Sequence, residues 1–96
     1  MPKRTDSNQK SIVAALRKHG CTVQTLHEVG DGCPDLLCGI DGMNILLECK
    51  DGTKPPSKRK LTPEQVARHG KWYGQVDVVT SPVEAIRAVN RHTYEI

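Results

Sequence analysis

An Asp-Gly pair at residues 41–42 is the strongest short hairpin signal in this chain. A two-residue type I′ loop needs positive φ at both central positions, and aspartate followed by glycine is among the pairs that such loops prefer. With this loop, Ile40 faces Met43, and counting outward from them places Asp35 directly opposite Glu48. The turn therefore predicts two carboxylates that face each other across adjacent strands.

That pairing needs a positive partner, because directly opposed Cβ atoms lie about 4.5–5.5 Å apart and like charges at this separation are destabilising. A divalent cation between Asp35 and Glu48 would resolve the conflict, and carboxylate oxygens suit hard ions such as Mg²⁺ or Mn²⁺. Period-two alternation puts Lys50 on the same face as Glu48. Two carboxylates with an ammonium group beside them can support metal-assisted attack on a phosphodiester.

A different loop gives a different interpretation of the same residues. A four-residue loop over residues 41–44 would set Asp35 against Lys50 as an ordinary cross-strand ion pair. Such surface pairs contribute about 0–1 kcal/mol and carry no functional meaning. Spacing alone leaves both registers open.

Composition limits the class of protein. Ninety-six residues are expected to form one domain, residues 1–96, and a formal net charge of +3 favours a polyanionic partner. No apolar run is long enough to span a bilayer, and the N-terminus lacks the apolar segment of a signal peptide. We therefore expect a protein of the cytoplasm that does not associate with membranes.

The four cysteines show no metal-ligand spacing. Neither a Cys-x-x-Cys pair nor a His-x-x-x-His pair occurs, so we expect no zinc site. Cys38 and Cys49 fall on the apolar face of the predicted hairpin, where a free cysteine packs as a small hydrophobic residue. Reduced structural thiols are the expected state.

Helices and strands are expected to alternate along the chain. Apolar spacing, a cap at Ser7 or Asp6 and a stop at Gly20 predict a first helix over residues 7–19. A second helix begins at Pro63, with Thr62 and Gln65 forming a capping box. The remaining expectations are strands at 21–29, 34–40 and 43–50, a short buried strand at 76–79 and a polar basic loop at 51–60. The second helix is expected to end near residue 73, and a last helix to begin at residue 81.

This order, αβββαβα, predicts an α/β fold with a mixed four-stranded sheet flanked by helices. Pro34-Asp35 begins the second strand, Glu48-x-Lys50 lies in the third, and Gln65 stands at the head of the next helix. The ordered set resembles the PD-(D/E)xK nuclease superfamily, and within it the small stand-alone phage and prophage proteins of the VRR-NUC group. The resemblance implies a restriction-endonuclease-like core and a homodimeric, metal-dependent DNA endonuclease acting on branched DNA such as Holliday junctions.

The resemblance also implies roles for particular residues. Asp35 and Glu48 match metal-binding carboxylates, the backbone carbonyl of Cys49 a third ligand, and Lys50 the catalytic lysine. Gln65 matches a glutamine near the active centre, although the capping box explains it independently and both roles can coexist.

Members of the family often supply a further acid from the first helix. The aligned candidate here is Asp6, because no glutamate occurs in that segment. Asp6 is shorter than the usual acid and could simply cap the helix, and Gln9 is the other contributor from that helix.

The basic residues Lys54, Lys58, Arg59 and Lys60 directly follow the predicted site, where a phosphate backbone would lie. The alternative is a solvated loop, or a DNA-binding module without catalysis. The three aromatic residues are scattered and form no stacking platform in the sequence, so recognition through backbone and shape is expected.

Overall fold

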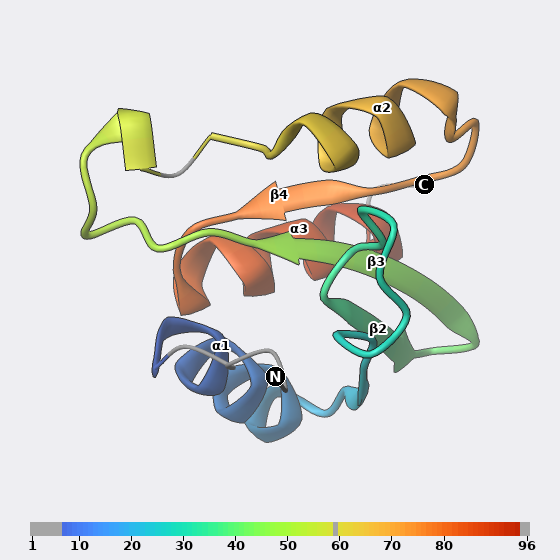
Figure 1. Ribbon diagram of the computed structural model, residues 1–96. Coiled ribbons are helices and arrows are strands. Elements are labelled where there is room, and N and C mark those ends of the chain that lie inside the picture. The colour runs from blue at the N-terminus through green and yellow to red at the C-terminus, as the bar shows by residue number, and fades with distance from the viewer. Residues whose placement is uncertain (1–6, 59, 95–96) are drawn as a thin grey trace.

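A computed structural model describes residues 7–58 and 60–94 and shows an α/β fold (Figure 1). Its helices are α1 (Ser7–His19), α2 (Pro63–Lys71) and α3 (Pro82–Tyr94), and a 3₁₀ turn, η1, spans Pro56–Lys58. Its strands are β1 (Thr22–Thr25), β2 (Leu36–Ile40), β3 (Met43–Cys49) and β4 (Asp77–Val79). The predicted order of helices and strands is confirmed, and none of the described helices is long and apolar enough to cross a membrane.

The four strands form one mixed sheet in the order β1-β2-β3-β4. Neighbouring strands from β1 to β3 are antiparallel, and β4 runs parallel to β3. Helices α1 and α3 pack against each other and against the sheet, and α2 lies on the other side (Figure 1). The apolar core is formed mainly between the sheet and the α1–α3 pair, with Ile12, Leu16, Leu36, Leu47 and Val89 completely buried.

The β2–β3 turn has the two-residue form. Asp41 and Gly42 adopt positive φ angles of 51° and 77°, and Ile40 pairs with Met43. The prediction of this register is confirmed, and the alternative pairing of Asp35 with Lys50 is wrong. Leu36 pairs with Leu47, so the next step along both strands sets Asp35 beside Glu48.

Several predicted boundaries are wrong by a few residues. The first strand ends at Thr25 rather than residue 29. The Leu26 N–H still donates to the Asp35 carbonyl (2.8 Å), and the chain then turns, with the Val29 N–H donating to the Leu26 carbonyl (3.0 Å). The second helix ends at Lys71, where Trp72 adopts an extended conformation and caps it. The predicted loop at 51–60 contains the 3₁₀ turn. The prediction that residues 76–79 form a buried strand is only partly right, because β4 lies at the edge of the sheet, with Val79 buried and Val78 44% exposed.

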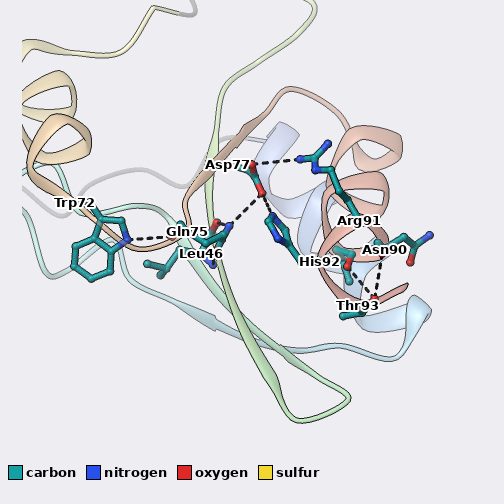
Figure 2. Close-up of polar contacts among 9 residues, drawn as sticks. Leu46, Trp72, Gln75, Asp77, Asn90, Arg91, His92 and Thr93 are labelled. Carbon is teal, nitrogen blue, oxygen red and sulfur yellow. Dashed lines mark hydrogen bonds and ion pairs between the residues drawn. The ribbon is translucent and has the colours of Figure 1, made fainter. Parts of the chain in front are cut away.

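A side-chain amide continues the pairing of β3 beyond the start of β4. Gln75 Oε1 accepts the Leu46 N–H (2.8 Å), and Gln75 Nε2 donates to the Leu46 carbonyl (2.7 Å) and to Asp77 Oδ2 (3.2 Å). Asp77 in turn pairs with His92 (2.6 Å) and Arg91 (3.3 Å) at the end of α3 (Figure 2). This network joins the segment after α2 to both the sheet and α3.

Replacing Gln75 tests the value of this amide. Gln75→Ala leaves both backbone groups of Leu46 without these bonds, which we expect to lower the free energy of unfolding by about 1–3 kcal/mol. The matched control is Gln24→Ala on the exposed edge strand β1, whose amide donates to the neighbouring Thr25 carbonyl, with an expected change within about 0.5 kcal/mol. Urea unfolding measures the free energy of unfolding of both variants. An equal loss of stability in the two would contradict a stabilising role for the bonds between Gln75 and Leu46.

Candidate active site

The hairpin brings Asp35 to the end of β3. Asp35 Oδ2 accepts a hydrogen bond from the backbone N–H of Cys49 at 2.7 Å. In an extended strand, the N–H and the carbonyl of one residue face the same neighbouring strand, so the Cys49 carbonyl is directed to the side where Asp35 lies. The carboxylate and the carbonyl expected as metal ligands thus lie on the same side of β3.

Glu48 is the most deeply buried charged residue of the described chain, with 1% of its surface exposed. Burial, then a hydrogen bond to Asp35 and the charge of that residue, raise the pKa of Glu48 to about 9, while Lys50 acts in the opposite direction. Its Oε1 atom has no hydrogen-bond partner within residues 7–58 and 60–94. Without a bound cation, the carboxyl group of Glu48 therefore keeps its proton at neutral pH.

Lys50 is held by the head of α2. Its Nζ donates to Gln65 Oε1 at 2.7 Å, and the same oxygen accepts the Thr62 backbone N–H at 2.9 Å. The Gln65 N–H donates to Thr62 Oγ1 at 3.2 Å, which completes the predicted capping box. One glutamine side chain therefore both caps the helix and positions the lysine.

The sequence analysis missed Asn8. Its Nδ2 donates to the Lys50 carbonyl at 2.7 Å and to the Thr80 carbonyl at 3.3 Å, which connects α1 to the ends of β3 and β4. No local signal marks this role, because the partners lie 42 and 72 residues away along the chain. Asn8 fixes the backbone of Lys50 while Gln65 fixes its side chain.

A cavity of about 240 Å³ lies on the Asp35 and Gln65 side of the site, and Glu48 and Lys50 are not among the residues that line it. Asp35 and Gln65 line it, together with Gln9, which is 6% exposed and comes from the helix expected to contribute to the site. The other residues that line this cavity are Leu26, His27, Gly30, Gly32, Cys33, Thr62 and Glu64. The carboxylate and the lysine's partner thus share one solvent-accessible recess.

The predicted DNA-binding residues are only partly described. Lys54 and Lys60 are exposed, and Lys58 belongs to η1. Arg59 and the candidate acid Asp6 lie outside the described residues. The basic segment follows β3 directly, so Lys54 and Lys60 are presented to solvent after the site.

All four cysteines are free thiols. Burial raises the pKa of Cys38 to about 12 and also raises the pKa of Cys21. Cys38 and Cys49 are buried in the core, as predicted for the apolar face of the hairpin. These thiols pack as small apolar groups.

The donor set suits a hard divalent ion. No three His, Cys, Asp or Glu side chains converge as a metal site in the part of the chain that the structure describes. The available donors are the carboxylates of Asp35 and Glu48 and the carbonyl of Cys49, all oxygen atoms of the kind that Mg²⁺ and Mn²⁺ prefer. A cation there would meet Glu48 Oε1, a buried atom with no bond to another described residue.

No family model, curated protein or solved structure matches this chain. The resemblance to PD-(D/E)xK nucleases therefore rests on the motif residues and on their order along the chain. Its implications for activity, metal and partners are proposals.

The state of Glu48 makes stability depend on pH in the metal-free protein. Between about pH 4.5 and pH 9 the unfolded chain has an ionised Glu48 while the folded chain keeps the proton, so the free energy of unfolding falls as pH rises. We expect the wild type to lose stability relative to Glu48→Gln across this range, by at most about 1.4 kcal/mol per pH unit. Chemical denaturation in EDTA at a series of pH values measures the difference, and parallel pH profiles would refute it.

Proposed function

We propose that this protein is a metal-dependent DNA endonuclease that hydrolyses phosphodiester bonds. The observation that carries the proposal is the buried Glu48 carboxyl beside Asp35, with Lys50 held next to it by Gln65. Asp35, Glu48 and the Cys49 carbonyl would hold Mg²⁺ or Mn²⁺. A bound ion of this kind polarises a phosphoryl oxygen and lowers the pKa of a bound water.

The protein's own groups supply position and charge. The Lys50 ammonium group has three N–H donors, and one of them bonds to Gln65 Oε1. The other two N–H groups can orient a water molecule or a phosphate oxygen. Its positive charge offsets negative charge that develops on the phosphoryl group. Glu48 must release its proton to bind a cation, so metal binding becomes tighter as pH rises.

The substrate, assembly and location are extensions of the same proposal. Exposed Lys54 and Lys60, with Lys58 and Arg59 between them, suit a DNA backbone that leaves the cavity. Branched duplex DNA such as a Holliday junction, cut by a homodimer with one site for each strand, is the substrate that the motif resemblance favours. The same resemblance favours the cytoplasm of a bacterial or phage-infected cell as its location.

Cleavage assays with matched variants test the activity. Purified protein is titrated with Mg²⁺ or Mn²⁺ on junction, flap, linear duplex and single-stranded DNA. We expect Lys50→Ala and Glu48→Gln to lower the cleavage rate at least about a hundredfold with the fold intact by circular dichroism. Lys54→Ala is the control, expected to weaken DNA binding while the rate at saturating DNA is kept. A Lys50→Ala protein that cuts at the parental rate would contradict the mechanism.

The alternative is a DNA-binding module without catalysis, which the exposed Lys54 and Lys60 alone would support. It predicts DNA binding that weakens with salt but is indifferent to divalent metal and to Glu48. Binding measured with and without Mg²⁺, for the wild type and Glu48→Gln, separates the two functions. Metal-independent binding without any cleavage would favour the module.

The two roles of Gln65 can be separated by comparing it with its capping partner. Thr62→Ala removes the cap alone and is expected to cost about 1 kcal/mol of stability while most activity remains. Gln65→Ala also releases the Lys50 ammonium group, so we expect a further loss of at least about tenfold in cleavage rate. Gln65→Glu keeps an acceptor for both partners and should recover stability. Equal rates for Thr62→Ala and Gln65→Ala would refute a positioning role.

A further inference from the structure

A second cavity lies beside the candidate active site, along α2. It has a volume of about 390 Å³ and is lined by Asp31, Glu64, Ala67, Arg68, Lys71 and Trp72. Glu64 also lines the cavity that contains Asp35, so the two recesses adjoin. We refer to the second recess as the α2 groove.

Trp72 offers a fixed aromatic surface in this groove. Its indole N–H donates to the Gln75 carbonyl at 3.1 Å, and Gln75 is itself bonded to Leu46 and Asp77 (Figure 2). Asp77 is paired with Arg91 and His92 of α3. The ring's polar edge is thus satisfied by the protein, yet 44% of the residue remains exposed. A ring held in this way can stack on a base without first being ordered.

Two cations lie beside the ring. Arg68 and Lys71 are three residues apart on α2 and therefore share one helix face. Arg68 Nε donates to the Asp31 carbonyl at 3.3 Å, which holds the guanidinium group in the groove. The acids Asp31 and Glu64 also line the groove. Glu64 lies at the junction between the groove and the cavity that Asp35 lines. Arg68 and Lys71 are the cationic residues among those that line the groove, and their charge suits phosphate.

We infer that the α2 groove binds an unpaired nucleic-acid strand, with one base stacked on Trp72 and the adjacent phosphates at Arg68 and Lys71. This inference departs from the sequence-based expectation of recognition through backbone and shape alone, because the fold sets one aromatic ring beside two cations in a single groove. Aromatic stacking combined with cationic side chains is the common mode of single-strand binding. The inference rests on the proposed function for its biological meaning. It then assigns the substrate class: DNA with an unpaired segment next to the phosphate that is cut. A flap or a splayed arm has this form, whereas a fully paired Holliday junction and an intact linear duplex do not. The groove therefore narrows the branched substrate proposed above to one with an unpaired strand.

Trp72 is the only tryptophan in the chain, so its fluorescence reports directly on the groove. The Glu48→Gln protein without metal is titrated with a thymidine oligonucleotide of about ten nucleotides, and separately with a blunt duplex at equal phosphate concentration. We expect saturable quenching by the single strand and markedly weaker quenching by the duplex. Titration of the protein alone serves as the baseline.

Variants measured with a labelled oligonucleotide complete the test. Trp72→Ala should weaken binding about fivefold to a hundredfold, the loss typical of one base–aromatic stack, and Trp72→Phe should recover part of it. Tyr73→Ala is the matched control, because Tyr73 is fully exposed and does not line the groove. Its affinity should equal that of the parent.

The outcomes separate this inference from the proposed function. Absent quenching, or an unchanged affinity of Trp72→Ala, overturns the groove assignment even if the wild type cuts DNA with Mg²⁺. If the oligonucleotide quenches the fluorescence and Trp72→Ala binds it more weakly, but the wild type cuts no DNA, the groove binds a single strand and the nuclease proposal is refuted. Fluorescence that changes with protein concentration alone, together with self-association in sedimentation, would assign the groove to a second copy of the chain and overturn the inference.

Discussion

The register of the β2–β3 hairpin is the constraint on which the candidate site depends. Because side chains alternate along a strand, a slip of one residue would move Glu48 to the other face and separate it from Asp35. The positive φ angles at Asp41 and Gly42 fix a two-residue loop and so exclude such a slip. Asp35 and Cys49 are 14 residues apart along the chain, and the hydrogen bond from the Cys49 N–H to Asp35 Oδ2 holds the open end of the hairpin together.

The Glu48 carboxyl is difficult to explain by stability alone. A buried acid next to a second acid is held in its neutral form, and a glutamine or an apolar side chain of similar size would fill the same space without that conflict. Groups whose pKa is strongly perturbed by burial and by a charged neighbour concentrate at functional sites. A cation between the two carboxylates would offset the unfavourable interaction, and this is the physical argument for the proposed metal.

Local rules predicted part of this structure and could not predict the rest. The bounds of α1, the turn at residues 41–42 and the Thr62–Gln65 capping box depend on neighbouring residues, and all three were predicted correctly. The burial of Glu48 and the contact of Asn8 with the Lys50 carbonyl depend on packing between distant segments. The sequence motifs identified the candidate residues, but the contacts that these residues make could be seen only in the folded structure.

Helix α2 carries residues of both the candidate site and the groove. It buries none of its residues, so its position depends on a few polar bonds and on a close backbone approach at Gly32. Gly32 has a φ of +74°, and a Cβ atom there would overlap the Glu64 carbonyl, so the loop before Asp35 fits against α2 only because this residue is glycine. A segment with so little apolar burial shifts at low free-energy cost. Gln65 lies in the first turn of α2 and Trp72 is its C-cap, so one short helix carries both the residue that holds Lys50 and the aromatic ring of the groove.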